Sequence, residues 1–217
     1  MASKNKKGLI LIIGGLLLIV AALFLVGYNL LEENNASRAA NDVATQLTEK
    51  IQAQQQQNQD DGESSGTNQE NIPIVLPDYV INPDMEMPVE TIDGRDYIGV
   101  LEVPAYDLTL PVIADWSYSA LKVAPCRYTG SAYKGNFVIA GHNYRAHFSY
   151  VKNLQPGDRV IFTDMAGNIF TYKVVLNETL QPKEVEEMTG GGWDLSLFTC
   201  NYSGNARVTI RCEKVET

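Results

Sequence analysis

The sequence contains few cysteines, and the three that it has, Cys126, Cys200 and Cys212, lie far apart along the chain. Three cysteines are too few for the disulfide framework of a small secreted domain, and no two of them form a CxxC motif. No cysteine or histidine pair has the close spacing of a structural zinc site. We therefore expect neither a metal ion nor a cofactor.

Positive charge is also scarce, since 17 Lys and Arg residues stand against 26 Asp and Glu residues, a net charge of -9. A nucleic-acid-binding protein would usually present a basic face, so we expect no nucleic-acid partner. The acidic balance is typical of a soluble, exposed surface. A chain of 217 residues has room for one ordinary domain with appendages.

Residues 8–27 form an apolar run without a charged side chain, GLILIIGGLLLIVAALFLVG. As a helix, a run of this length spans roughly 30 Å, which matches the hydrocarbon core of a membrane. A cleaved signal peptide is the alternative, but its apolar stretch usually has only about 7–15 residues. Three lysines precede the run, and Glu32 and Glu33 follow it. By the positive-inside tendency, residues 1–7 are cytoplasmic, residues 8–27 are a single-pass anchor in the cell membrane, and the remainder is extracytoplasmic.

Residues 28–73 are polar and are predicted to be a partly disordered linker. Apolar residues in its first part follow a helical spacing: Ala36, Ala40, Val43, Leu47 and Ile51. We interpret this stripe as a frayed helix without a specific role, although it could also lie on the membrane or on the domain. Residues 52–71 are rich in Gln, Asn and Ser and are predicted to be disordered. Such a coil would hold the domain roughly 25 Å from the membrane.

Residues 74–217 have the pattern of a folded domain made of short strands. The domain consists of short apolar runs punctuated by Pro, Gly and Asp. Seven of these runs are typical of strands, at 97–104, 108–114, 136–142, 158–164, 169–178, 195–200 and 206–213. Helical patterns occur only near 117–123, 148–154 and 183–189. Because no long helix separates the strands, a parallel α/β fold is disfavoured. We predict an all-β domain with short helices, a closed β-barrel of about seven to eight strands preceded by one transmembrane helix.

Cys200 lies at the end of one predicted strand, and Arg207 begins the next, after a loop of six residues. If these strands are neighbours, the thiol and the guanidinium lie at the same edge of the sheet. On the second strand, alternation places Arg207 and Arg211 on one face and core residues such as Ile210 on the other. Both arginines are therefore expected to face away from the main apolar interior.

His142 follows an apolar strand and Gly141, a position that exposes a side chain at the rim of a barrel. The only other histidine, His147, lies in the following loop, where we expect a surface role. A single histidine is more often structural than catalytic. Here, however, a cysteine and an arginine occupy similar strand-end positions.

These motifs together resemble the sortases, the cysteine transpeptidases of Gram-positive bacterial surfaces. The resemblance rests on Ala140–Asn143, Leu197–Cys200 and Arg207–Ile210 in this order, and it covers about Tyr97 to Glu213. It implies that residues 74–217 are a catalytic domain. Cys200 would be the nucleophile, His142 the acid and base, and Arg207 the residue that stabilises the oxyanion. Arg211 is a rival for the last role, because the loop between Cys200 and Arg207 is short.

The resemblance also implies the reaction and its partners. The enzyme would cleave the C-terminal sorting motif of surface proteins through a thioester and transfer the acyl group to an amine of a peptidoglycan precursor or a pilin. The Gly-His-Asn triplet is similar to class B or a related subclass. The segment Asn82–Met85 lacks the Asp-Pro-aromatic element of a class C lid.

Three questions stay open from the sequence. A membrane-anchored cysteine peptidase would use the same residues with water as the second nucleophile, and a non-catalytic barrel could bind a surface partner. The remaining thiols, Cys126 and Cys212, are interpreted as small buried residues, and a disulfide between them is the alternative.

Overall fold

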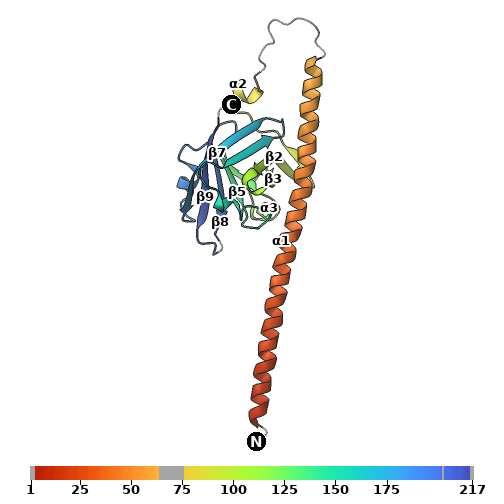
Figure 1. Cartoon of the computed structure of the whole chain (residues 1–217), viewed down its shortest axis with the longest axis vertical. Helices are drawn as coiled ribbons and strands as arrows, with labels where there is room; N and C mark the ends of the chain where they lie inside the picture. The colour runs from red at the N-terminus through yellow and green to blue at the C-terminus, as the bar shows by residue number, and fades with distance from the viewer. Residues whose placement is uncertain (1–2, 64–75, 202, 216–217) are drawn as a thin grey trace.

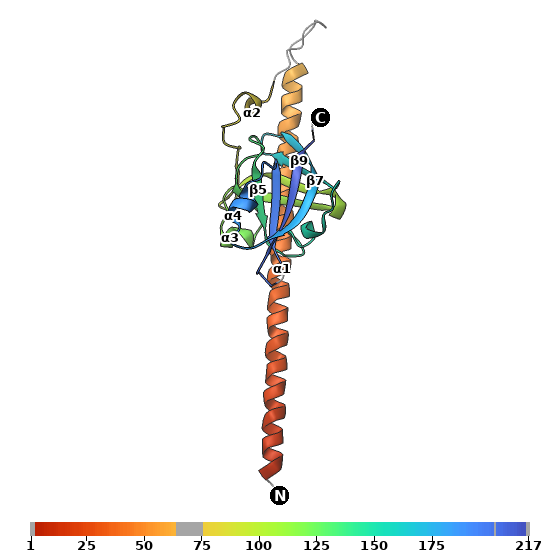
Figure 2. The same cartoon turned by 90° about the vertical axis from the view of Figure 1, so that its left-hand side faces the viewer.

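The computed structural model describes residues 3–63, 76–201 and 203–215. It consists of one very long helix, α1 (Ser3–Glu63), and a β-barrel that lies beside the C-terminal half of this helix (Figure 1). The view turned by 90° shows the helix passing along one side of the barrel (Figure 2). The N-terminal half of α1 projects away from the barrel, and its apolar side chains from Leu9 to Leu31 are exposed.

The barrel is formed by short strands with brief helical segments between them. The strands are β1 (Glu90–Ile92), β2 (Arg95–Val103), β3 (Leu108–Ile113), β4 (Cys126–Thr129), β5 (Phe137–Gly141), β6 (Arg159–Asp164), β7 (Ile169–Leu180), β8 (Leu195–Cys200) and β9 (Arg207–Lys214). The helical segments are α2 (Asp78–Ile81), η1 (Pro104–Tyr106), α3 (Tyr118–Leu121), η2 (Val151–Asn153) and α4 (Val185–Thr189).

The strands pair in the order β1-β2-β3-β4-β5-β8-β9-β7-β6, and β6 pairs back with β2. This last pairing closes a barrel of strands β2 to β9, and β1 extends the edge of β2. The pairs β3–β4 and β5–β8 are parallel, and the other pairs are antiparallel. The predicted closed, all-β barrel is confirmed, as are all seven predicted strands. The prediction missed β1 and β4, because three- and four-residue strands are too short to show a clear apolar period.

The inside of the barrel is a continuous apolar core. It includes Ile98, Leu101, Leu110, Val112, Phe137, Ile139, Phe162, Phe170, Leu195, Leu197 and Ile210, each completely buried. These residues alternate along their strands with residues of the outer face, as a closed barrel requires. The alternation visible in the sequence therefore determines which side chains fill the interior.

A second apolar cluster joins α1 to the outside of β2 and β3. Val43, Leu47 and Ile51 of the helix pack there with residues such as Tyr97 and Ile113. The amide of Gln55 also donates a hydrogen bond to the Gly167 carbonyl at 3.0 Å. The helical stripe predicted from the sequence is thus a docking face, whereas a frayed helix without a role was expected.

The structure also differs from the coil predicted over 52–71, because α1 continues to Glu63. Residues 64–71 lie outside the described residues. The low apolar content of 52–63 suggested disorder, but this segment extends a helix whose preceding turns are already held on the barrel. The docked turns already form the nucleus of the helix, so extending it through these residues requires no new nucleation. The boundaries of the linker at 28 and 73 stay a prediction.

The docking face of α1 gives a first testable prediction. Leu47 is completely buried, so Leu47→Ala should lower the free energy of unfolding by about 2–4 kcal/mol. Urea unfolding of the full chain in detergent micelles measures this change. Gln54→Ala, an exposed position on the same helix, is the matched control and should change stability by less than about 0.5 kcal/mol. An equally small effect of Leu47→Ala would mean that the helix does not pack on the barrel.

Candidate active site

The pairing of β8 with both of its neighbours brings the three predicted site residues to one end of the barrel. β5 and β8 are parallel, with Gly141 opposite Thr199, so both strands end at the same edge. β9 is antiparallel to β8 and begins there, with Arg207 directly opposite Cys200. His142 follows the last residue of β5. The predicted neighbouring strands, with the thiol and guanidinium at a common edge, are confirmed.

Below this edge, side chains of β5, β8 and β9 that point to the same face form successive cross-strand rows, and we call each row a rung. One rung down from the Cys200 and Arg207 pair, Phe198 lies between Ala140 and Thr209. One rung further, Ser196 lies between Val138 and Arg211. An apolar cluster covers the upper part of this face and consists of Val138, Ala140, Met188 and Phe198, with Leu121, Tyr128 and Leu180 packed against it. The edge that carries Cys200 and Arg207 therefore has apolar side chains beside it on this face of the sheet.

Cys200 is partly exposed and lies at a pocket, whereas the other two thiols are completely buried. Cys200 is half-buried and lines a pocket of about 650 Å³ together with His142, Asn143 and Tyr144 of one loop and Asn201, Ser203 and Gly204 of the next. The other two cysteines are free and completely buried, Cys126 between α1 and the barrel and Cys212 inside the barrel. Burial raises the pKa of each of these two thiols to about 12. Their interpretation as small buried residues is confirmed, and the alternative of a disulfide between them is wrong.

A tight loop positions His142. The carbonyl of His142 accepts a hydrogen bond from the Phe148 backbone N–H at 3.1 Å, which folds the chain back on itself. The Phe148 ring then lies directly on Gly141, where an added Cβ would come within 2.3 Å of the ring. Glycine before the histidine is therefore a steric requirement of this loop. The His142 ring stacks on the Tyr144 ring, with centroids 3.8 Å apart.

The predicted surface position of His147 is wrong, because this side chain is completely buried. The centroid of its ring lies 5.5 Å from that of Tyr144, the residue that stacks on His142. Burial, followed by the nearby charge of His142, lowers the pKa of His147 from 6.5 to about 4, and a contact with the Val123 backbone acts weakly in the opposite direction. His147 is consequently a neutral packing residue near neutral pH. The loop folds inward because Phe148 packs in the core, and this is not visible in the local sequence.

The two arginines of β9 have different surroundings. Arg207 is half-buried, and its Nη1 donates to the carbonyls of Gly204 and Ala206 at 3.3 and 3.4 Å, within the loop that follows Cys200. Its guanidinium is thus held at the same end of the barrel as the thiol.

Arg211 lies two rungs away from Cys200 and is buried, although it faces away from the main core as predicted. It forms an ion pair with Glu178 at 2.7 Å and donates to the hydroxyl of Ser196 at 2.9 Å and to the Met188 carbonyl at 2.8 Å. These bonds occupy the guanidinium in linking β7, β8 and α4. The arrangement favours Arg207 over the rival Arg211 as the cation near the thiol.

The arrangement places a thiol and an imidazole at one pocket and a guanidinium at the same end of the barrel. This combination suits acyl transfer through a thioester. In the part of the chain that the structure describes, no group of three or more His, Cys, Asp or Glu side chains could hold a metal ion. Sequence reasoning missed two residues of the pocket wall, Asn29 and Glu33 of α1. No local motif marks them, because they reach the pocket only through the docking of the helix.

The fold and this site define a cysteine-based acyl-transfer enzyme, and the comparisons with known proteins identify its family. The profile of the sortase domain matches residues 101–215, which is more than half of the chain. The chain therefore belongs to the sortase family, and it is a cysteine transpeptidase. No curated protein matches the sequence.

Solved sortase structures resemble the chain in fold. The sortase D5 transpeptidase of Clostridium perfringens is 21% identical over 58% of this chain and 83% of its own length, with a TM-score of 0.51. Sortase E of Streptomyces avermitilis is 25% identical over 55% of this chain and 88% of its own length, with a TM-score of 0.48. Sortase C of Clostridium perfringens SM101 is 21% identical over 81% and 91%, also with a TM-score of 0.48. The matches come from several sortase classes, and the class B-like subclass stays a prediction.

The surroundings of the three thiols predict selective alkylation. In the native protein at pH 8, iodoacetamide should modify Cys200 and leave Cys126 and Cys212 unmodified, because both are buried and protonated. Mass spectrometry of peptide digests measures the sites. After denaturation without reductant, all three thiols should react. Native labelling of Cys126 or Cys212 at a comparable rate would contradict the placement of these residues.

The buried His147 predicts a pH-dependent stability. Between pH 6.5 and 4 the unfolded chain binds a proton at this residue that the folded chain does not, so stability should fall as the pH falls. The loss from this residue should reach at most about 3 kcal/mol and should be absent above pH 7. Urea unfolding of the full chain in detergent micelles at pH 7, 5.5 and 4.5 measures it. His147→Phe should flatten the profile in this range, whereas His142→Phe, which removes only the smaller cause of the lowered pKa, should retain most of the loss.

Proposed function

We propose that Cys200 is the catalytic nucleophile, that His142 is the acid and base, and that Arg207 stabilises the oxyanion. The observation that carries this proposal is the register of β8, which sets Cys200 opposite Arg207 and beside the end of β5, where His142 follows. Two facts support it further: Cys200 is the thiol that lines the pocket, and Arg211 is engaged in a buried ion pair.

In the proposed reaction, the Cys200 thiolate attacks the carbonyl carbon of the scissile peptide bond. The oxyanion that forms accepts hydrogen bonds from the Arg207 guanidinium, which exchanges its bonds to the Gly204 and Ala206 carbonyls for them. The intermediate collapses, the C–N bond breaks, and the leaving amine takes a proton from protonated His142. A second amine then attacks the thioester and loses a proton to His142. A new amide forms, and the Cys200 thiolate is released.

We propose that the acyl donors are surface proteins with a C-terminal sorting motif and that the acceptor is an amine of a peptidoglycan precursor or a pilin. The enzyme would act as a single-pass membrane protein with a cytoplasmic N-terminus and an extracytoplasmic catalytic domain. An apolar segment of α1 with a mean hydropathy of 3.3 and no buried residues fits such an anchor. The lysines before this segment favour the proposed orientation.

A trapping experiment tests the proposed function. The full-length enzyme is incubated with a pool of peptides derived from the C-terminal sorting signals of surface proteins, with and without an added amine such as triglycine. Mass spectrometry should detect an acyl adduct on Cys200, and the amide product should form only with the amine. Cys200→Ala should form no adduct, and Arg207→Ala should lower turnover by about 10²–10³-fold. Release of the acid at the same rate without the amine would instead indicate a peptidase, and unchanged activity in Cys200→Ala would exclude catalysis by this thiol.

A further inference from the structure

The wall of the active-site pocket includes part of the long helix. Asn29 and Glu33 of α1 line the same pocket as His142 and Cys200. Glu33 also holds the loop that follows His142, because its Oε1 accepts a hydrogen bond from the Arg145 backbone N–H at 2.7 Å. The helix is thus attached to the catalytic end of the barrel as well as to β2 and β3.

A neighbouring hollow shows that this contact extends over more than one turn of the helix. It is lined by Leu30, Glu33, Asn34 and Ser37 of α1 and by Arg145 and Ala146 of the loop. From here the buried stripe continues along α1 through Val43, Leu47 and Ile51. The segment from residue 29 to residue 51 is therefore in contact with the barrel along most of its length, which leaves little freedom for the domain to swing about the helix.

The pocket begins where the apolar run of the helix ends. The run ends at Gly27, and Asn29 and Glu33 follow it by two and six residues within the same uninterrupted helix. At the rise of an α-helix these residues lie only about 3 and 9 Å beyond the end of the run. The apolar side chains before Gly27 are exposed.

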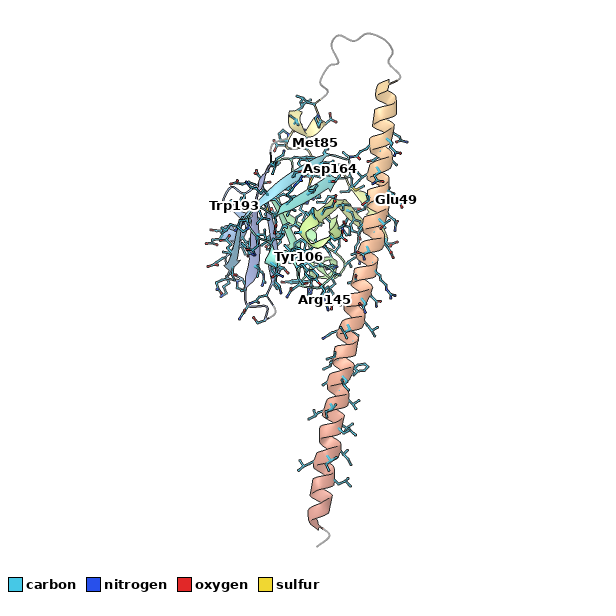
Figure 3. All side chains as sticks on the ribbon, viewed as in Figure 1. Glu49, Met85, Tyr106, Arg145, Asp164 and Trp193 are labelled. Carbon is cyan, nitrogen blue, oxygen red and sulfur yellow. The ribbon has the colours of Figure 1, made fainter. Side chains whose placement is uncertain are left out.

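The catalytic end of the barrel is also the end that faces the apolar half of α1. Arg145, three residues after His142, lies at the end of the barrel nearest the projecting half of the helix (Figure 3). Asp164 and Met85 are labelled at the opposite end, near the C-terminal end of α1 (Figure 3). The pocket that holds Cys200 therefore lies at the end of the barrel nearest the apolar segment of the helix.

We propose that α1 acts as a rigid strut that holds the catalytic pocket against the lipid headgroups, so that Cys200 reacts preferentially with groups displayed within about 10 Å of the membrane surface. This inference rests on the proposed anchoring of the apolar segment in a membrane. It replaces the flexible spacer expected from the sequence with a fixed height and a fixed orientation. The lipid surface then forms one boundary of the space from which reactants enter.

A lipid-borne thiol reagent tests this height without a substrate. The full chain is reconstituted in phosphatidylcholine vesicles that contain phosphatidylethanolamine carrying a maleimide on a short linker. The wild-type protein should form a lipid adduct at Cys200, located by peptide mass spectrometry, and Cys200→Ala should form none at that site. Inserting a seven-residue polar helical segment after Gly27 raises the barrel by about 10 Å while rotating it by only about 20°. This insertion should slow lipid labelling at least 10-fold.

Three controls separate the distance of the thiol from the membrane from its chemical reactivity. A water-soluble maleimide should label Cys200 at the same rate in the wild type and in the lengthened variant, and a maleimide lipid with a long polyethylene glycol spacer should restore labelling of the variant. The same insert placed between α1 and α2, beyond the docked helix, should leave short-linker labelling unchanged. The proposed strut would be wrong if the short-linker lipid labelled the wild type and the lengthened variant equally. It would also be wrong if the soluble reagent labelled the wild type but the short-linker lipid did not. Failure of the protein to float with the vesicles would overturn the anchoring itself, while leaving the proposed catalytic roles untouched.

Discussion

The hydrogen-bonded register of β8 between β5 and β9 is the constraint on which the site depends. β8 is parallel to β5 and antiparallel to β9, so one strand places the C-terminal end of β5, its own C-terminal end and the beginning of β9 at a common edge. A shift of one residue would turn Cys200 toward the core and Thr199 outward. The interior residues Leu195 and Leu197 prevent such a shift, because their burial defines which face of β8 is inside. Packing of the core and geometry of the site are thus consequences of the same alternation.

The same face of the sheet uses two arginines in different ways. Arg211 is buried, and its bonds to Glu178, Ser196 and the carbonyls near α4 satisfy its charge, as a buried guanidinium requires. Arg207 donates two long hydrogen bonds to loop carbonyls, which an oxyanion could replace. The two arginines thus differ because of their positions along β9: Arg211 has a structural role, and Arg207 is available for chemistry. The short loop between Cys200 and Arg207 is compatible with this division because the two residues form a direct cross-strand pair.

The helix adds a constraint that the barrel alone does not have. Its apolar stripe covers the outside of β2 and β3, and the polar residues before that stripe reach the pocket. In the proposed membrane-anchored arrangement, this long contact with the helix would fix both the distance of the pocket from the membrane and its direction. In a sortase, whose chemistry joins two separate molecules, a fixed position of the thiol determines which of them can approach.

The sequence by itself determined the class of fold, the strand ends and the identity of Cys200, His142 and Arg207 as candidates. These depend on local alternation, on residue type and on the order of short motifs, all of which are local in the chain. Tertiary structure alone decided that His147 is buried, that Arg211 is engaged by α4, and that the stripe from Ala36 to Ile51 docks on the barrel as part of a helix that runs to Glu63. Each of these outcomes requires a partner that is distant in sequence. The loop of His147 packs through Phe148 into the core, Arg211 bonds to carbonyls of α4, and the helix docks on the outer surface of β2 and β3. A mostly polar segment resembles a flexible spacer in sequence until the apolar surface that receives its stripe of Ala, Val, Leu and Ile side chains is known.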